Sequence, residues 1–319
     1  MRIETPGGDM RLPDFMIIGA AKSGTTSLYH YLGQHPGLYF PRDFKEPGYF
    51  CFAGHVDAPV HNGLPDMWKS AITDLNDYLG LFEDAREGTL IGEATPEYLL
   101  LPAATIERMQ STYGPAALGE LKFISILRNP VDRMWSHYWM MLRDGYENLS
   151  FHEATQPEVI SQRLESGWHP GYDYIGYGRY GAQLMAYRQV FRPDQIKAIL
   201  YEDFSRDPLE VCREVFAFLG VVPDYQPDVH VRYNFSGALR HPRLHRFLFA
   251  RESVFKSLAR RLVPYERLQV IKSRLQRWNC QKVPMPHAER RRLAALYRDD
   301  VGLLSDILGR DMSHWLSQG

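Results

Sequence analysis

The chain has 319 residues, of which 45% are hydrophobic and 24% are charged, and its formal net charge is −1. This composition is ordinary for a globular protein with one large or two small α/β domains, and we expect no nucleic-acid partner. The three cysteines lie far apart and form no disulfide or metal-binding pattern, and no apolar run is long enough to span a membrane.

The most informative segment follows the first predicted strand, an apolar run over residues 15–19. A loop rich in glycine and hydroxyl groups comes next and leads into a helix predicted over 24–34, an arrangement that binds anions at the helix N-terminus. The loop nearly matches the phosphate loop G-x-x-x-x-G-K-[ST], but Thr25 stands where that motif has lysine, and the lysine occurs at Lys22. From the loop itself, Lys22 would meet the first phosphate and its attached group, which suits a nucleotide with a short 5′ tail.

Two further strands are predicted in the first hundred residues, over 37–40 and 89–93, and the second ends in Glu93. Helices are predicted over 72–84 and 102–111. Because the carboxyl ends of strands in an open α/β sheet face the ligand crevice, Glu93 is a candidate ligand-binding residue. Stabilisation of nearby loop amides is the alternative role.

A second anion motif follows the strand predicted over 121–127. This strand ends in Arg128, whereas the corresponding strand of a nucleoside triphosphatase often ends in a magnesium-binding aspartate. Pro130 is suited to open the helix predicted over 130–143, and Ser136 lies about two turns into that helix. A cation followed by hydroxyl groups suits a second phosphate rather than a metal ion, so we expect no metal here.

The next part of the chain is predicted to form helices over 151–166, 179–191 and 207–219, with a strand over 196–201. Residues 168–180 are rich in aromatic side chains, which stack on sugars and other rings but more often pack in cores. Trp168 and Tyr172 are the candidate ligand-binding residues of this segment.

Alternating strands and helices predict an α/β fold with a P-loop-like central parallel sheet flanked by helices and a helical C-terminal part. We expect one domain over 1–319, with residues 1–12 as an N-terminal tail and residues 240–319 as a mainly helical extension of the same domain. Residues 238–282 hold twelve Lys and Arg but two acidic residues. A solvated basic helix and a surface for an anionic ligand or lipid are the two interpretations.

The two anion motifs together resemble those of the sulfotransferases that use 3′-phosphoadenosine 5′-phosphosulfate. Residues 21–27 are similar to the 5′-phosphosulfate loop of that family, and residues 127–138 are similar to its 3′-phosphate motif. The similarity is greatest to the branch that holds the heparan-sulfate-type and bacterial sulfotransferases, and it covers most of residues 13–317. Shorter matching segments lie at 45–46, 92–98, 201–204 and 308–315.

This resemblance implies which residues bind the nucleotide. Lys22 would bind the 5′-phosphosulfate and stabilise the leaving phosphate oxygen, while Arg128 and Ser136 would bind the 3′-phosphate. Residues 179–181 resemble a family segment near the cofactor, and residues 234–240 resemble a loop that closes over the nucleotide. The expected cofactor-binding residues are Lys22, Ser23, Gly24, Thr25, Thr26, Ser27, Arg128, Ser136, Tyr180, Ser236, Gly237 and Arg240.

Sulfuryl transfer also needs a base that removes the acceptor proton. The resemblance places the catalytic glutamate at Glu46, and the alternative is that Lys45 and Glu46 are an exposed charged pair. Gly48 stands where the family often has histidine, which weakens the case for a relay between glutamate and histidine. His137 is a second candidate for the base, and packing is its alternative role.

The acceptor side of the site is expected to include Glu46, Glu93, Trp168 and Tyr172. Some relatives have lysine where Ala94 stands, and its absence argues mildly against a highly anionic polysaccharide. A carbohydrate, a lipid or small-molecule alcohol and a phenol remain possible acceptors.

The main prediction is therefore a metal-independent O-sulfotransferase whose partners are a sulfate-donor nucleotide and a hydroxyl acceptor. Two alternatives stay open: a P-loop nucleotide kinase, which would need lysine at position 25 and a magnesium-binding carboxylate, and a non-catalytic nucleotide-binding protein. Animal Golgi members of the family carry a membrane anchor, and this sequence shows neither an anchor nor a signal peptide, so we expect a cytoplasmic bacterial enzyme.

Overall fold

A five-stranded parallel β-sheet forms the centre of the molecule, with the strand order β4-β5-β3-β6-β7. The strands are β3 (Phe15–Gly19), β4 (Leu38–Tyr39), β5 (Leu90–Ala94), β6 (Lys122–Leu127) and β7 (Ile196–Leu200). The structure is a computed structural model that describes residues 1–5, 8–41, 44–52, 71–231, 237–239, 278–281 and 283–317. The strand order places β3, and hence the loop that follows it, in the middle of the sheet.

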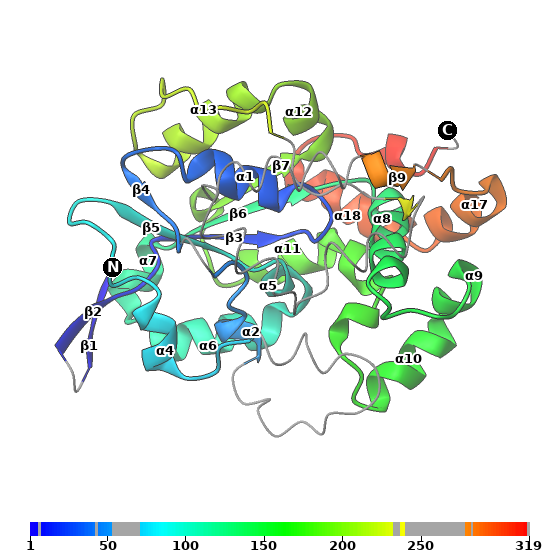
Figure 1. Cartoon of the computed structure of the whole chain (residues 1–319), viewed down its shortest axis with the longest axis horizontal. Helices are drawn as coiled ribbons and strands as arrows, with labels where there is room; N and C mark the ends of the chain where they lie inside the picture. The colour runs from blue at the N-terminus through cyan, green and yellow to red at the C-terminus, as the bar shows by residue number, and fades with distance from the viewer. Residues whose placement is uncertain are drawn as a thin grey trace.

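Helices cover both faces of this sheet (Figure 1). Helices α1 (Thr25–Leu32) and α13 (Pro208–Leu219) lie on one face, and α5 (Glu97–Leu100), α6 (Pro102–Thr112) and α11 (Tyr180–Arg188) lie on the other. Along β3, Phe15 and Ile17 pack into the core beneath α1 and α13, whereas Met16 and Ile18 pack into the opposite core. Burial on both faces explains why β3 is a continuous apolar run rather than an alternating one.

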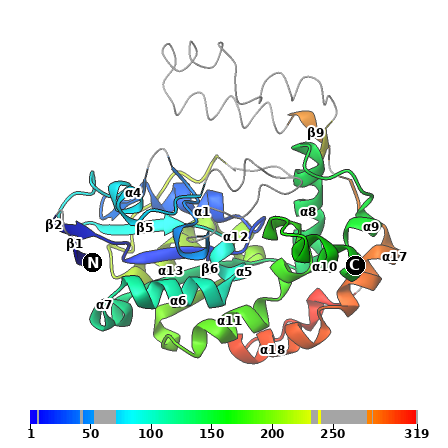
Figure 2. The same ribbon diagram turned by 90° about the horizontal axis from the view of Figure 1, so that it is seen from below.

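Most of the remaining helices lie beyond the carboxyl ends of the strands (Figure 1). Helix α18 packs against α11 near the C-terminus, as Figure 2 shows from below. The α-helices of this part are α8 (Pro130–Arg143), α9 (Phe151–Ala154), α10 (Pro157–Glu165), α17 (His287–Ala295) and α18 (Arg298–Leu308). The other short helices of the described chain are α2 (Tyr49–Phe52), α4 (Leu75–Gly80), α7 (Pro115–Glu120), α12 (Tyr201–Arg206), η1 (Pro170–Tyr172), η2 (Gly176–Gly178), η3 (Pro193–Gln195) and η4 (Ser313–Trp315).

The predicted α/β fold class is confirmed, and the five predicted strands correspond to β3 to β7. One predicted helix is interrupted, because residues 151–166 form α9 and α10 as two separate helices. Pro157 is the first residue of α10, and a proline cannot continue a helix because it lacks the N–H and its ring clashes with the preceding turn.

The N-terminal residues form more structure than the expected tail. Strands β1 (Arg2–Thr5) and β2 (Gly8–Arg11) pair as an antiparallel hairpin. Arg11 donates hydrogen bonds to the carbonyl oxygens of Arg86 (2.9 Å) and Thr89 (2.5 Å). These partners lie about eighty residues away in the sequence, so a local pattern could not indicate them.

The described C-terminal part is mainly helical, as predicted, with α17 and α18, and it also contains one short strand. Strand β9 (Cys280–Gln281) pairs antiparallel with β8 (Ala238–Leu239). A strand of two residues has no periodicity to detect, and its partner precedes it by about forty residues. Residues 240–277, which include most of the basic segment, lie outside the described residues.

Candidate nucleotide-binding and catalytic site

The loop between β3 and α1 is held against the neighbouring strand. The N–H of Ala20 donates to the carbonyl oxygen of Ile126 in β6 (2.8 Å). At Gly19, an added Cβ would lie 2.7 Å from the Cβ of Leu99, so α5 approaches too closely for any side chain. Gly24 adopts the left-handed conformation (φ 103°) at the N-cap of α1 and provides no side chain to cap the helix. The first turn of α1, with Thr25, therefore faces the loop with main-chain N–H groups suited to an anion.

Lys22 joins the two anion motifs. Its carbonyl oxygen accepts a hydrogen bond from the guanidinium of Arg128 (3.3 Å), which lies at the end of β6. Its Nζ donates to the Sδ of Met140 in α8 (3.3 Å). Burial lowers the pKa of Lys22 to about 8, with a further contribution from the positive charge of Arg143. The amine is therefore still mostly protonated at neutral pH, as a site for a phosphosulfate requires.

Arg128 and the start of α8 form the second motif. The guanidinium of Arg128 lies over the ring of Tyr201, 5.0 Å from its centroid. Asn129 caps α8 by accepting hydrogen bonds from the N–H groups of Val131 (3.0 Å) and Asp132 (3.3 Å). This cap fixes the direction of the helix that carries Ser136, which is 3% exposed.

Two buried hydroxyl groups beside this junction have no hydrogen-bond partner among the described residues. They belong to Ser23, in the loop, and Tyr180, the first residue of α11. Burial raises the pKa of Tyr180 to about 12, and Arg133, Ser23 and Arg128 oppose the shift, so these groups lie near its hydroxyl. Because buried polar groups are rarely left unpaired, this pair of donors fits an anion with several acceptor oxygens.

Glu46 lies on the loop before α2 and is exposed. It adopts a left-handed backbone conformation (φ 67°) and forms an ion pair with Lys45. The negative charge of its carboxylate raises the pKa of Lys22 and also that of Glu97, so Glu46 lies close enough to both residues to act on them electrostatically.

Gly48, where the family often has histidine, is also left-handed (φ 69°), and a Cβ there would lie 2.7 Å from Phe52. A side chain at this position would need the loop to change, so the relay between glutamate and histidine is not available in this conformation.

Glu97 is a charged group beside Glu46 that the sequence argument did not select. Its Oε1 accepts a hydrogen bond from the hydroxyl of Tyr177 (3.1 Å). Burial raises the pKa of Glu97 to about 7, and the negative charge of Glu46 adds to the shift. Its position at the first residue of α5, just beyond the end of β5 and so at the ligand-facing end of the sheet, was the available signal.

Glu93 occupies the core rather than a surface that an acceptor could contact. It is 1% exposed, and its Oε2 accepts hydrogen bonds from the hydroxyls of Tyr78 (3.1 Å) and Tyr98 (3.3 Å). Burial raises the pKa of Glu93 to about 8. The predicted acceptor-binding role of Glu93 is therefore not supported by its surroundings.

His137 is buried next to Ser136 in α8. Its Nδ1 lies 3.0 Å from Nη1 of Arg133, and because arginine can only donate, Nδ1 is the acceptor. Burial lowers the pKa of His137 well below its usual value, and the positive charge of Arg133 adds to the effect. The imidazole is therefore neutral, with its proton on Nε2, which suits a donor better than a base.

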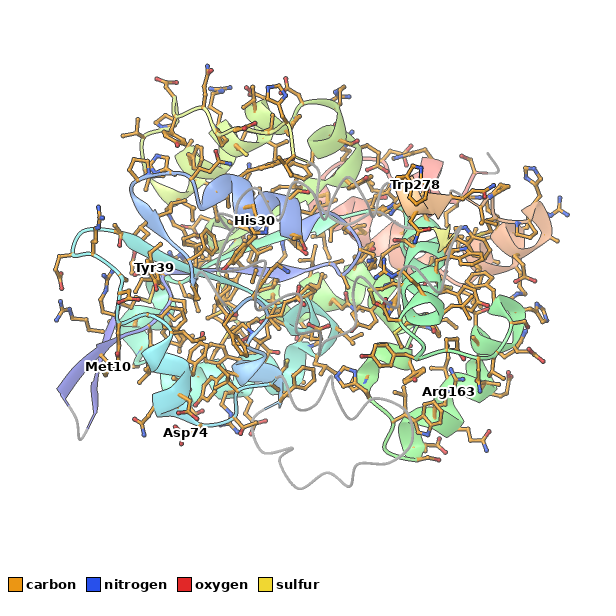
Figure 3. The ribbon with its side chains drawn as sticks, in the orientation of Figure 1. Met10, His30, Tyr39, Asp74, Arg163 and Trp278 are labelled. Carbon is orange, nitrogen blue, oxygen red and sulfur yellow. The ribbon has the colours of Figure 1, made fainter. Side chains whose placement is uncertain are left out.

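Trp168 and Tyr172 pack against a buried ion pair at α10. Arg163 pairs with Glu147 (2.7 Å), and its guanidinium lies 4.8 Å from the centroids of both rings. Tyr172 is fully buried and donates to the carbonyl oxygen of Tyr146 (2.5 Å). Figure 3 shows Arg163, a residue of α10, away from the central sheet. These contacts describe packing, and none of them joins the two aromatic residues to Lys22 or Glu46.

The remaining expected cofactor-binding positions lie in the segment 234–240. Gly237 is buried and precedes β8, while Ser236 and Arg240 lie outside the described residues.

Within the described ranges, no group of three or more His, Cys, Asp or Glu side chains could hold a metal ion. No described helix is long and apolar enough to cross a membrane.

The chain matches the family model described as "Sulfotransferase domain" over residues 12–233. It is 30% identical to a sulfotransferase from Alicyclobacillus acidocaldarius, whose crystal structure superposes with a TM-score of 0.71, with 96% of this chain and 100% of that chain covered.

Two curated relatives are longer proteins, of which this chain matches only a part. One is the human bifunctional heparan sulfate N-deacetylase/N-sulfotransferase 3, 26% identical over 67% of this chain. The other is the mouse heparan sulfate glucosamine 3-O-sulfotransferase 3A1, 27% identical over 67% of this chain. The matches span 23% and 47% of those proteins, respectively. The family model and the bacterial structure both cover most of the described site, and the chain belongs to the sulfotransferase family.

Proposed function

We propose that this protein transfers a sulfuryl group from 3′-phosphoadenosine 5′-phosphosulfate to an acceptor hydroxyl group. The observation that carries this proposal is the hydrogen bond from Arg128, at the end of β6, to the main chain of Lys22 in the loop after β3. Two cations at neighbouring strand ends suit a nucleotide with phosphate groups at both its 5′ and its 3′ position.

The polar groups around this junction fit such a nucleotide. The buried hydroxyls of Ser23 and Tyr180 lack partners among the described residues, and phosphate and sulfate oxygens would accept from both. The main-chain N–H groups at the start of α1, from Thr25 to Ser27, would hold the 5′ group, and Arg128 with Ser136 would hold the 3′-phosphate.

The chemistry assigned to Lys22 is electrostatic. When bound, the donor supplies an activated sulfuryl group held for in-line displacement. Negative charge then develops on the leaving phosphate, and the protonated Nζ of Lys22 stabilises it together with the N–H groups of the loop. Lys22 is partly buried, and the same desolvation that lowers its pKa to about 8 makes its interaction with the developing charge less screened than in bulk water.

Glu46 is the proposed base. Its exposed carboxylate faces Lys22 and Glu97 and takes the proton from the acceptor hydroxyl. His137 is a weaker candidate, because a second positive charge would have to form beside Arg133. In this proposal the Nε2–H of His137 donates a hydrogen bond instead.

The proposed acceptor is a carbohydrate or a small-molecule or lipid alcohol. Glu46 and Glu97 place two carboxyl groups on the acceptor side of Lys22, and Ala94 supplies no cation there. These charges favour a neutral or cationic acceptor over a polyanionic chain, although the names of two curated relatives mention heparan sulfate. We further propose a cytoplasmic bacterial enzyme, and the similarity to the Alicyclobacillus acidocaldarius sulfotransferase supports the bacterial origin.

The direct test is transfer of labelled sulfate from the donor nucleotide to a panel of a sugar, a long-chain alcohol and a phenol. We expect labelled product with at least one hydroxyl compound and none when the hydroxyl is replaced by hydrogen. Binding of the donor with no transfer to any member of the panel would instead favour a non-catalytic nucleotide-binding protein.

A further inference from the structure

The backbone of the loop that carries Glu46 is held by groups other than Glu46 itself. Glu46 is exposed, its ion pair is with the adjacent Lys45, and its left-handed conformation is one that residues other than glycine adopt when their surroundings enforce it. The N–H of Gly48 donates to Oγ1 of Thr95 (3.3 Å), and the N–H of Phe50 donates to the hydroxyl of Tyr98 (3.4 Å).

Both of these hydroxyl groups lie at one buried carboxyl group. The Tyr98 hydroxyl donates to Oε2 of Glu93 (3.3 Å), and the Thr95 side chain favours the charged form of the same carboxyl. Tyr78 donates to the same Oε2 (3.1 Å) and stacks on Tyr49 of α2, with ring centroids 4.6 Å apart. The carboxyl group thus contacts the side chains that hold both the loop and α2.

The direction of the Tyr98 hydroxyl proton decides how firmly Glu93 holds the main chain at Phe50. A tyrosine hydroxyl has one proton and can also accept hydrogen bonds. The Tyr98 hydroxyl directs its proton at Glu93, which accepts the hydrogen bond. The lone pairs of the Tyr98 oxygen are therefore available to the N–H of Phe50. Without the carboxyl group, the proton has no fixed acceptor, and the hydroxyl can rotate away from Phe50.

We infer that Glu93 is a positioning residue, a buried carboxyl group that fixes the Glu46 loop through Thr95 and Tyr98. This inference rests on the proposed function for the role of Glu46 as base. The geometric part, however, concerns only the loop and can be measured without any sulfate transfer.

Two cysteines of this chain provide that measurement. Cys51 lies in α2, directly after the loop, and is 2% exposed, with its Sγ 3.5 Å from the carbonyl oxygen of Gly48. Cys212 lies in α13, on the opposite face of the sheet, and is fully buried in the other core. Release of the loop exposes Cys51 alone, whereas global unfolding exposes both thiols.

The experiment follows alkylation of each cysteine by peptide mass in Glu93→Ala and Glu93→Gln. We expect Glu93→Ala to label at Cys51 at least about tenfold faster than the unsubstituted protein, with Cys212 unchanged, because a buried hydrogen-bond acceptor is lost. Glu93→Gln keeps an acceptor oxygen of the same size and is expected to label at Cys51 within about twofold of the unsubstituted protein. Tyr98→Phe removes only the hydroxyl and is expected to expose Cys51 as well, so the test stands if Glu93→Ala does not fold.

Activity gives the second readout. In Glu93→Ala, kcat for sulfate transfer is expected to fall while the Kd for adenosine 3′,5′-bisphosphate stays the same, and Glu93→Gln is expected to restore kcat. Equal labelling of Cys51 in all variants, or parallel increases at Cys51 and Cys212, would overturn the inference. If the unsubstituted protein transfers no sulfate but Glu93→Ala still labels faster at Cys51, the proposed function is overturned and the geometric inference stands.

Discussion

The guanidinium of Arg128 donates a hydrogen bond over 3.3 Å to the main-chain carbonyl oxygen of Lys22, and so joins the ends of two adjacent parallel strands. The bond does not use the side chain of Lys22, which stays available to a ligand on the same side of the sheet. It also leaves other N–H groups of the guanidinium for a second anion, because the group has five. In the proposed function, the two residues bind one nucleotide from neighbouring strands.

Lys22→Ala is expected to lower turnover by about 10²–10³-fold, the usual scale for one preorganised electrostatic group. The measurement is steady-state sulfate transfer with saturating donor. Lys197→Ala is the control, because Lys197 on β7 forms a partly exposed ion pair with Glu214 on α13. A loss of only a few-fold at Lys22 would show that the amine does not stabilise the leaving group.

The pKa of Lys22 predicts the alkaline limb of the pH profile. Its protonated form is the active one, so turnover should fall as the pH rises through about 8. Lys22→Arg, whose side chain stays charged, should move this fall to higher pH even if its turnover is lower. An unchanged alkaline limb in Lys22→Arg would assign that limb to another group.

Arg128→Ala is expected to weaken binding of adenosine 3′,5′-bisphosphate by about 10–100-fold, the effect of losing one hydrogen bond to a charged group. The same substitution should change the affinity for adenosine 5′-phosphate much less, because that nucleotide lacks the 3′-phosphate. Arg192→Ala removes an exposed arginine that pairs with Asp194 and serves as the control. Equal losses for both nucleotides would place Arg128 away from the 3′ position.

Glu46→Gln is expected to lower kcat strongly and to leave the affinity for adenosine 3′,5′-bisphosphate nearly unchanged. The amide has the size of the carboxyl group but cannot remove a proton. Glu210→Gln, at an exposed pair with Arg213, controls for the loss of one negative charge. If nucleotide affinity fell together with kcat in Glu46→Gln, the residue would be a binding group rather than the base.

The raised pKa of Glu93 predicts how the free energy of unfolding depends on pH. Its folded-state pKa of about 8 lies above the usual 4.5, so the folded chain keeps a proton that the unfolded chain loses between these values. The contribution of this proton is therefore complete below pH 4.5 and is lost as the pH rises through about 8. Urea unfolding at pH 5 and pH 9 should show a smaller stability difference in Glu93→Gln than in the unsubstituted protein. An equal difference in both would mean that Glu93 is ionised in the folded state.

The parts of the site that the sequence predicted lie on local motifs at neighbouring strand ends. Lys22 and Arg128 meet because the strands before them are parallel neighbours, which the alternating pattern of strands and helices indicates. The orientation of α8 likewise follows from Asn129 and Pro130, a cap and a first helical residue that are adjacent in the sequence.

The rest of the site depends on contacts that no local pattern contains. Glu93 and Tyr172 stand beside aromatic or glycine-rich segments typical of binding sites, yet each is enclosed by partners distant in the sequence, such as Tyr78 and Arg163. Glu97 gains its raised pKa from burial and from Glu46, a residue on a different loop. Burial and partner identity decide these roles, and both are properties of the folded chain.

The most direct test of the central claim is calorimetric titration with adenosine 3′,5′-bisphosphate, with ATP and magnesium as the comparison. The account predicts tight binding of the bisphosphate without added metal, a weak response to ATP, and a large loss of bisphosphate affinity in Arg128→Ala. Preference for ATP with magnesium would contradict the account, because it would assign the loop after β3 to a nucleotide kinase.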